Sequence, residues 1–392
     1  MPVTDDEVVA VIQSLPATSF LRNYIIHCGQ QTNAPLVYHV GGGLATLATS
    51  IPKNLYVRYG GSLYPNIYTL FVGRSGDERK STSVGFSREL VSLAYPDRVG
   101  TGFGSEEGLV ESLSEQGTQA IYVDEFGNFL SKSSSAGYFE SVKSRLTDLW
   151  DSRPTSRRLA NKKLLEVRDP RLSIVAGCAT KFLEEYTTTV DWEAGFMGRW
   201  FILYGVARPA NAFPLYNNSH TQVLYTFLQN RASILSAATW SGWDPAAIQT
   251  FTQWHDGLQT RSLGSSKVAG VKSRAPAIAL RLAMLLAWDY GQAANTGSQW
   301  FFTPAEIDPA IAFTEMYLRS VVEVSAAIAD TKEGVFKRKV VNTIRELGGS
   351  ASVPQLTATM QLIRKRDLTM CLEVLVEEGI LHMPALGFYQ LM

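Results

Sequence analysis

The run from Phe71 to Thr82 reads FVGRSGDERKST and has the composition of a loop that holds a polyphosphate. A glycine-rich turn between a strand and a helix presents backbone N–H groups to phosphate oxygens, and the helix N-terminus adds a partial positive charge. Lys80 would neutralise the β- and γ-phosphates, and the Ser81 hydroxyl would bind Mg²⁺. We therefore predict a site for ATP and Mg²⁺, with Ser81 as a metal ligand. The predicted nucleotide-binding residues are Gly73, Ser75, Gly76, Arg79, Lys80, Ser81 and Thr82.

The spacing of this loop departs from the standard pattern G-x-x-x-x-G-K-[ST]. Gly73 lies seven residues before Lys80 (80 − 73), so the loop is one residue longer, and Arg79 stands where the second glycine would be. The alternative is a basic loop that precedes an ordinary helix. The loop follows an apolar strand and opens a helix, and this context favours the phosphate-binding interpretation.

An acidic pair follows forty-four residues after Lys80 (124 − 80), at the end of the apolar run IYVDE. A buried strand that ends in Asp-Glu would place Asp124 in the Mg²⁺ shell and Glu125 beside the attacking water as a general base. The alternative is an acidic pair of the kind that is common at strand ends. The two motifs occur together and in order, with a strand and a helix between them, which indicates nucleotide hydrolysis.

Two later residues are further catalytic candidates. Thr180 follows the apolar run LSIVAG, where a polar side chain would contact the γ-phosphate; alternatively it is a helix N-cap. Arg199 stands at the start of another predicted strand, after the turn GFMG. It would reach a neighbouring subunit's nucleotide as an arginine finger, or form an ordinary salt bridge.

Two groups of basic residues are candidates for DNA contacts through phosphates. The first lies in residues 153–168, which would form a loop touching DNA or a solvated helix or hairpin with one polar face. The second lies near the C-terminus, on a predicted winged helix that would bind DNA or dock a protein. The candidate DNA-binding residues are Arg157, Arg158, Lys162, Lys163, Arg364, Lys365 and Arg366.

The elements that must position these residues alternate between strands and helices. Strands are predicted at 54–59, 67–72, 98–101, 119–124, 172–177 and 199–206, and helices at 80–94, 105–116 and 137–150. This alternation predicts an α/β fold with a mostly parallel sheet covered by helices on both faces. Helices broken by Pro16, Pro35 and Gly41–Gly43 are expected before this core, and a helical region is expected after it.

The C-terminal residues predict a separate compact unit. Helices are expected at 333–347, 353–360 and 365–378, followed by the apolar pair ILHM and GFYQLM. Three helices followed by a β-hairpin is the order of a winged helix. The chain is therefore expected to have four parts, at residues 1–50, 51–215, 216–330 and 331–392.

The composition narrows the class of protein. The 392 residues are 45% hydrophobic and 18% charged, enough apolar material for two or three units. The 36 basic residues balance the 36 acidic ones, so any contact with DNA must be local, in a patch or a pore. Three widely spaced cysteines indicate a reducing compartment, and we expect a cytoplasmic protein. The sequence has no run of about 18 apolar residues, so no membrane span is predicted.

Together these motifs resemble a family of helicase-like P-loop ATPases of phages, plasmids and integrated elements, often linked to primase-polymerase modules. The resemblance spans about residues 54–206. Its stretches occur in the family's order: LYPNIYTLFVGRSGDERKST, GFGSEEGLVESL, IYVDEFGNFL, LTDLWD, DPRLSIVAGCAT and GFMGRWFILYG. A loop ending in Arg-Lys-Ser-Thr is not foreign to that family. The resemblance implies a RecA/AAA+-type P-loop core, ring assembly and ATP-driven movement on DNA.

The leading hypothesis is therefore an ATP-dependent replicative DNA helicase or translocase of a mobile element. It would act as a homo-oligomeric ring, with six subunits expected, on single-stranded DNA. Lys80, Ser81, Asp124 and Glu125 would act in cis and Arg199 in trans, and a separate primase or polymerase would supply priming. One alternative is an ATP-dependent switch or scaffold that binds protein partners in transposition or defence. The other is a nucleotide-binding domain without turnover.

Overall fold

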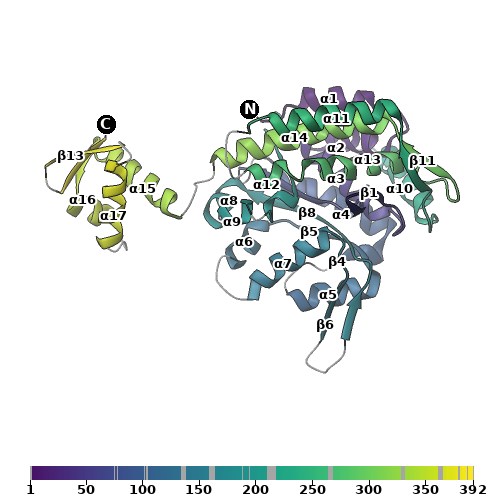
Figure 1. The fold of residues 1–392 in the computed structure, drawn as a ribbon, viewed down its shortest axis with the longest axis horizontal. Coiled ribbons are helices and arrows are strands. Elements are labelled where there is room, and N and C mark those ends of the chain that lie inside the picture. The colour runs from purple at the N-terminus through teal and green to yellow at the C-terminus, as the bar shows by residue number, and fades with distance from the viewer. Residues whose placement is uncertain are drawn as a thin grey trace. The chain divides into compact units, whose positions relative to one another are not determined.

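The structure is a computed structural model, and the chain divides into two compact units, Met1–Ala327 and Ile328–Met392 (Figure 1). It describes residues 2–74, 76, 78–100, 102, 105–133, 138–158, 164–187, 189–193, 195–209, 218–263, 268–327, 332–360, 365–377, 380–385 and 387–391. The larger unit therefore takes in the regions predicted at 1–50 and 51–215 and nearly all of the region predicted at 216–330.

A five-stranded parallel sheet forms the centre of the larger unit. Its strands are β3 (Tyr68–Gly73), β4 (Val99–Gly100), β5 (Thr118–Val123), β8 (Arg171–Ala179) and β9 (Trp200–Tyr204). Their order across the sheet is β4-β5-β8-β3-β9, and every neighbouring pair is parallel. All six residues of β3 are buried, as expected for a strand covered on both faces. The predicted α/β fold with a parallel sheet is confirmed, and such a sheet is compatible with a RecA-like core.

Helices cover both faces of this sheet, as two side chains of β3 show. Phe71 stacks on Tyr38 of α3 (Leu36–Ser50), with ring centroids 5.1 Å apart. Tyr68 donates a hydrogen bond to the Leu146 carbonyl of α7 (Tyr138–Trp150), at 2.9 Å. Because successive side chains of a strand point to opposite faces, residues three apart mark the two sides of the sheet.

The predicted helix break at Gly41–Gly43 is wrong, because α3 continues through all three glycines. A Cβ at Gly41 would lie 2.7 Å from Leu203 Cδ1 and 2.8 Å from Phe71 Cε1, so only glycine lets this helix approach the sheet so closely. Packing against the sheet outweighs the intrinsic cost of glycine in a helix, about 1 kcal/mol per residue.

The remaining elements of the larger unit's first two thirds surround the sheet. They are α1 (Asp5–Ser14), α2 (Phe20–Gln31), β1 (Val57–Tyr59), β2 (Gly61–Leu63), α4 (Lys80–Ala94), the 3-10 turn η1 (Pro96–Arg98), α5 (Glu106–Gln116), α6 (Phe126–Ser133), β6 (Thr155–Arg158), β7 (Leu164–Val167), α8 (Thr180–Tyr186), α9 (Thr189–Glu193) and the 3-10 turn η2 (Met197–Arg199). Strands β6 and β7 pair antiparallel, as do β1 and β2.

The sequence predicts a helical region after β9, but the structure also has a pair of strands there. The helices of this region are α10 (Asn218–Ala232), α11 (Pro245–Thr260), α12 (Ala269–Lys272), α13 (Ala275–Asp289) and α14 (Pro304–Ala327). Two strands, β10 (Thr239–Trp243) and β11 (Gln299–Phe302), pair in parallel among them. Asp289 accepts hydrogen bonds from the Ser19 hydroxyl and the Phe20 amide, both at 2.6 Å, which ties α13 to the start of α2. In the described part of the chain, no helix is both long and apolar enough to cross a membrane.

In its described residues, the smaller unit contains three helices and a three-stranded antiparallel sheet. Its elements are α15 (Lys332–Glu346), β12 (Ser350–Ser352), α16 (Val353–Thr359), α17 (Lys365–Glu377), β13 (Leu381–Ala385) and β14 (Phe388–Leu391). The sheet order is β12-β14-β13, with both pairs antiparallel. Ile344, Leu356, Leu372, Leu381 and Tyr389 belong to a hydrophobic core of the unit's own.

Removing residues 331–392 should leave a folded larger unit, because the smaller unit buries its apolar side chains in its own core. We expect the shortened chain to be soluble and to unfold cooperatively within a few °C of the full chain's transition. Thermal unfolding followed by circular dichroism, with size-exclusion chromatography, measures this. A shortened chain that is insoluble or molten would show that the tail completes the core of the larger unit.

Candidate functional site

A cavity of about 320 Å³ lies at the carboxyl ends of the parallel strands β3, β5 and β8. Seven of the predicted site residues line it together: Gly76, Arg79, Lys80, Ser81, Thr82, Asp124 and Glu125. Gly127, Gly177, Cys178, Ala179 and Phe182 complete the lining. The edge formed by strand carboxyl ends is where open α/β sheets bind ligands.

The loop between β3 and α4 begins at Gly73, where the neighbouring side chains leave no room for a Cβ. A Cβ at Gly73 would lie 2.6 Å from the Tyr38 hydroxyl oxygen and 3.1 Å from Glu78 Cδ. Tyr38 donates a 2.6 Å hydrogen bond to the Val72 carbonyl, and its burial, together with the Glu78 charge, raises its pKa well above the ordinary value. The loop therefore starts at a tightly packed position. The next predicted residue, Ser75, lies outside the described residues.

Lys80 points back into its own loop. Its ammonium Nζ donates to the Gly73 carbonyl at 3.3 Å and to the Arg74 carbonyl, and lies 4.0 Å from Glu78 Oε2. The lysine side chain is only 11% exposed. Lys80 also lines the cavity, so its positive charge would attract an anion bound there.

The first turn of α4 opens onto the same cavity. Ser81 and Thr82 are exposed there, and the cap residue Arg79 supplies no side-chain hydrogen bond to the helix end. The first N–H groups of a helix have no partner within the helix, so they can donate to a ligand's oxygens. Lys80, Ser81 and Thr82, the first residues of α4, all line the one cavity.

Arg79 has a left-handed backbone, with φ 50° and ψ 35°. Side-chain-bearing residues adopt this conformation at a cost of about 1–2 kcal/mol, whereas glycine does so freely. At position 79 the departure from the standard pattern is therefore one of side chain only, since Arg79 takes a conformation for which glycine is suited, whereas the extra residue earlier in the loop remains a difference of backbone.

Arg79→Gly should keep nucleotide binding and leave the free energy of unfolding unchanged or up to about 1 kcal/mol higher, because relief of strain is partly offset by a looser unfolded chain. Arg79→Ala is the matched variant, which removes the charge but keeps the strain. Calorimetric titration with ADP and urea unfolding measure both effects. If both variants lose affinity equally, the guanidinium itself contacts phosphate.

The acidic pair faces the lysine across β8. Asp124 and Glu125 are exposed to the cavity, and Glu125 Oε2 accepts a 2.7 Å hydrogen bond from Asn128 Nδ2. A Cβ at Gly177 of β8 would lie 3.0 Å from the Asp124 carbonyl oxygen and 3.3 Å from Lys80 Cβ. Glycine at this position therefore allows the two motifs to approach each other.

Sequence reasoning missed Asn128, Gly127, Gly177 and Phe182. A glycine inside a strand often marks a close backbone approach, and this signal was present at Gly177. Phe182, 38% exposed, packs over Gly127, where an added Cβ would lie 2.8 Å from Phe182 Cβ. Nothing in the local sequence marks Phe182 or Asn128.

The end of β8 contributes a different residue from the one predicted. Cys178 and Ala179 line the cavity, whereas Thr180 is the half-buried first residue of α8, whose N-cap is Ala179. Burial raises the pKa of the Cys178 thiol to about 12, so the thiol stays protonated at neutral pH. A contact between Thr180 and a γ-phosphate stays a prediction.

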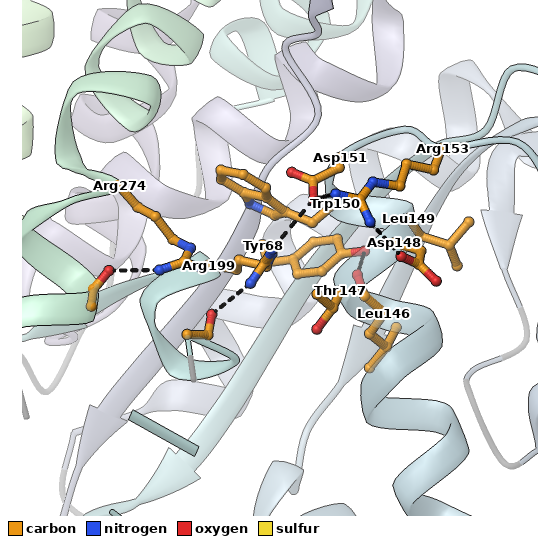
Figure 2. A network of polar contacts seen from close by, with 12 residues as sticks. Tyr68, Leu146, Thr147, Asp148, Leu149, Trp150, Asp151, Arg153, Arg199 and Arg274 are labelled. Carbon is orange, nitrogen blue, oxygen red and sulfur yellow. Dashed lines mark hydrogen bonds and ion pairs between the residues drawn. The ribbon is translucent and has the colours of Figure 1, made fainter. Parts of the chain in front are cut away.

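Arg199 lies at the amino ends of the parallel strands, opposite to the cavity, and directly precedes β9 (Figure 2). It donates to the Gly195 carbonyl at 2.9 Å and pairs with Asp151 at 3.3 Å, and its guanidinium lies over the Trp150 ring. Strands rise about 3.3 Å per residue, so the six-residue β3 separates the two edges by about 20 Å. Arg199 is therefore far from its own cavity, and its salt bridge is the alternative that the sequence left open.

The structure describes few of the basic side chains predicted to contact DNA. Arg157 forms ion pairs with Glu106 Oε2 at 2.6 Å and Glu107 Oε1 at 3.0 Å, which neutralise it. Arg158 ends β6, and Lys365 and Arg366 open α17, but these side chains lie outside the described residues. Lys162, Lys163 and Arg364 lie outside them altogether.

Comparison with known protein families and with curated proteins finds nothing that matches the chain. Over the described residues, no group of three or more His, Cys, Asp or Glu side chains is arranged to hold a metal ion. The cavity and its lining are therefore the features that point to a function.

Proposed function

We propose that the chain is a P-loop ATPase that binds ATP with Mg²⁺ and hydrolyses it. One observation carries this proposal: a single cavity is lined at once by Lys80, Ser81, Asp124 and Glu125. Forty-four residues separate the lysine from the aspartate in sequence (124 − 80), so only the fold brings them together. A basic loop before an ordinary helix would not require an acidic pair opposite to it.

The strand order supports this assignment. Strand β8 lies between β3, which leads into the loop, and β5, which ends in the acidic pair. The lysine and the carboxylates then face each other across one strand, with room between them for a phosphate chain. This arrangement fits the RecA/AAA+-type core that the sequence resemblance implies.

Each lining residue has a role in the proposed reaction. The loop amides, the first turn of α4 and Lys80 hold the phosphates. Ser81 and Asp124 fit Mg²⁺, which takes hard oxygen ligands and usually only one or two from the protein. The bound ion would neutralise charge on the phosphates. Glu125 takes a proton from the attacking water, and Asn128 orients its carboxylate by the 2.7 Å hydrogen bond.

We further propose that hydrolysis drives movement on DNA, as in a replicative helicase or translocase of a mobile element. The β6–β7 hairpin supports this, because Arg157 and Arg158 lie on it and the sequence adds Lys162 and Lys163 between its strands. The smaller unit runs helix, strand, helix, helix, strand, strand, which fits a winged helix able to bind DNA or a protein. A homo-oligomeric ring, with six subunits expected, and a separate primase or polymerase complete the proposal.

One observation favours the second candidate, an ATP-dependent switch or scaffold that binds protein. Arg157, the best described of the candidate DNA-binding residues, already pairs with two carboxylates. Phosphate contacts would require it to leave Glu106 and Glu107. In this alternative the hairpin and the smaller unit would bind a protein partner.

The test is steady-state ATP hydrolysis with Mg²⁺, with and without single-stranded DNA, beside a light-scattering measurement of mass in ATP. We expect turnover that Lys80→Ala abolishes, stimulation by DNA and a mass of several subunits. Turnover without DNA stimulation would favour the switch or scaffold. Nucleotide binding without any turnover would contradict the ATPase proposal and leave a binding domain.

A further inference from the structure

Two arginines from distant parts of the chain lie side by side near the amino ends of the parallel strands, which we call the amino edge of the sheet (Figure 2). Arg199 belongs to η2, before β9, and Arg274 caps the start of α13. Arg199 donates to the Gly195 carbonyl and Arg274 to the Gly270 carbonyl, each at 2.9 Å. We call Arg199, Arg274 and the nearby Asp151 the arginine cluster.

The turn beside the cluster is shaped around Arg274. Gly195 has φ +87°, and a Cβ there would overlap the Arg274 guanidinium. A Cβ at Gly198 would lie 3.4 Å from Arg274 Cδ and 2.9 Å from the Gly270 carbonyl oxygen. Both glycines of the GFMG turn therefore leave the space that Arg274 occupies.

The arginine cluster combines two positive charges with a single negative charge. Asp151 pairs with Arg199 at 3.3 Å and also with the exposed Arg153 at 3.4 Å. Over the described residues, no carboxylate lies within ion-pair distance of Arg274, whose pKa is lowered by burial and then by the Arg199 charge. Placing two partly buried like charges together is unfavourable unless an anion compensates them in some functional state. Guanidinium pairs suit phosphate, which they bind with two hydrogen bonds each.

We infer that Arg274 acts with Arg199 as a second arginine that contacts the phosphates of a nucleotide held by a neighbouring copy of this chain. The inference rests on the proposed function. The anion cannot come from the chain's own cavity, because that cavity lies at the carboxyl edge, about a strand length of 20 Å away. A second copy whose carboxyl edge meets this amino edge would bring its phosphates to both arginines. Such a contact joins two different surfaces and can close into a ring.

The experiment compares ATP binding and turnover in Arg274→Ala, Arg274→Lys and the control Arg153→Ala. Arg153 is 62% exposed and also pairs with Asp151. Its loss therefore removes one positive charge near the cluster but leaves Arg274 in its place beside the GFMG turn. We expect Arg274→Ala to bind ATP normally and to lose turnover at least about 10³-fold, the lower end of the range for an arginine acting in trans. Arg274→Lys should fold, keep the charge and still lose more than about 10-fold, because lysine cannot bind bidentately. Arg153→Ala should match the unchanged chain.

Mixing separates a role in trans from a structural one. Arg274→Ala subunits mixed with Glu125→Gln subunits should regain turnover, since one subunit then supplies Glu125 and the other Arg274. If the unchanged chain hydrolyses ATP and Lys80→Ala does not, but Arg274→Ala and Arg274→Lys retain full turnover, the inference alone is overturned. Lost turnover that no mixture restores also overturns it, as a structural role. If the unchanged chain does not hydrolyse ATP, the proposed function and the inference fall together.

Discussion

Glu125→Gln should bind ATP as tightly as the unchanged chain and hydrolyse it at least about 10²-fold more slowly. Glutamine keeps the size of the side chain and can still accept the Asn128 hydrogen bond, so the cavity should hold its shape. What it loses is the ability to take a proton from water. Equilibrium binding of a fluorescent ATP analogue and single-turnover hydrolysis separate the two effects.

Glu115→Gln is the matched control, since Glu115 is exposed on α5 and does not line the cavity. It should leave turnover unchanged. Asn128→Ala should give a smaller loss than Glu125→Gln, because it loosens the carboxylate without removing it. Full turnover in Glu125→Gln would refute its role as the general base and leave the acidic pair as a metal site only.

Arg199→Ala should bind ATP normally and lose turnover by about 10³-fold or more, as expected when an arginine finger is removed. Mixing it with Lys80→Ala subunits, which should not bind nucleotide, should restore part of the activity. At one mixed interface, an intact Lys80 of the first subunit meets an intact Arg199 of the second. Hydrolysis measured across a series of mixing ratios checks this expectation.

Asp151→Asn distinguishes this role from a structural one, because it breaks the 3.3 Å ion pair but keeps Arg199. If Arg199 acts on a neighbour's phosphate, Asp151→Asn should retain most turnover. If the pair only holds the fold together, both variants should lose thermal stability and activity alike. Co-assembly without any recovery in the mixtures would contradict action in trans.

The longer strands of the core sheet can be predicted from the sequence because each is a short, mostly apolar run. The helix predicted at 80–94 is α4 with the same bounds, and the strand predicted at 119–124 is β5, displaced by one residue. The β10–β11 pair was missed because its strands lie in separate parts of a chain dominated by helical periodicity. Only the packed structure brings Trp240 opposite Trp300.

The candidate site divides in the same way. Lys80, Ser81, Asp124 and Glu125 carry their chemistry in residue type and order, so they could be named without a structure. The backbone of Arg79 could not, because a left-handed conformation at an arginine is imposed by the turn and not by its side chain. Arg274 was also missed, since its significance depends on lying beside Arg199, seventy-five residues earlier (274 − 199).

The contacts of Lys80 determine how the affinity for a phosphate ligand should depend on salt concentration. In the structure its ammonium is already hydrogen-bonded to the Gly73 and Arg74 carbonyls. An incoming phosphate would exchange these two neutral acceptors for anionic ones, beside the Glu78 carboxylate that already lies 4.0 Å from the ammonium, and the number of hydrogen bonds at the lysine would change little. The gain is mainly coulombic, and mobile ions weaken coulombic attraction at a partly exposed site. The affinity that Lys80 contributes should thus diminish as ionic strength rises, whereas a contribution from hydrogen-bond number would persist.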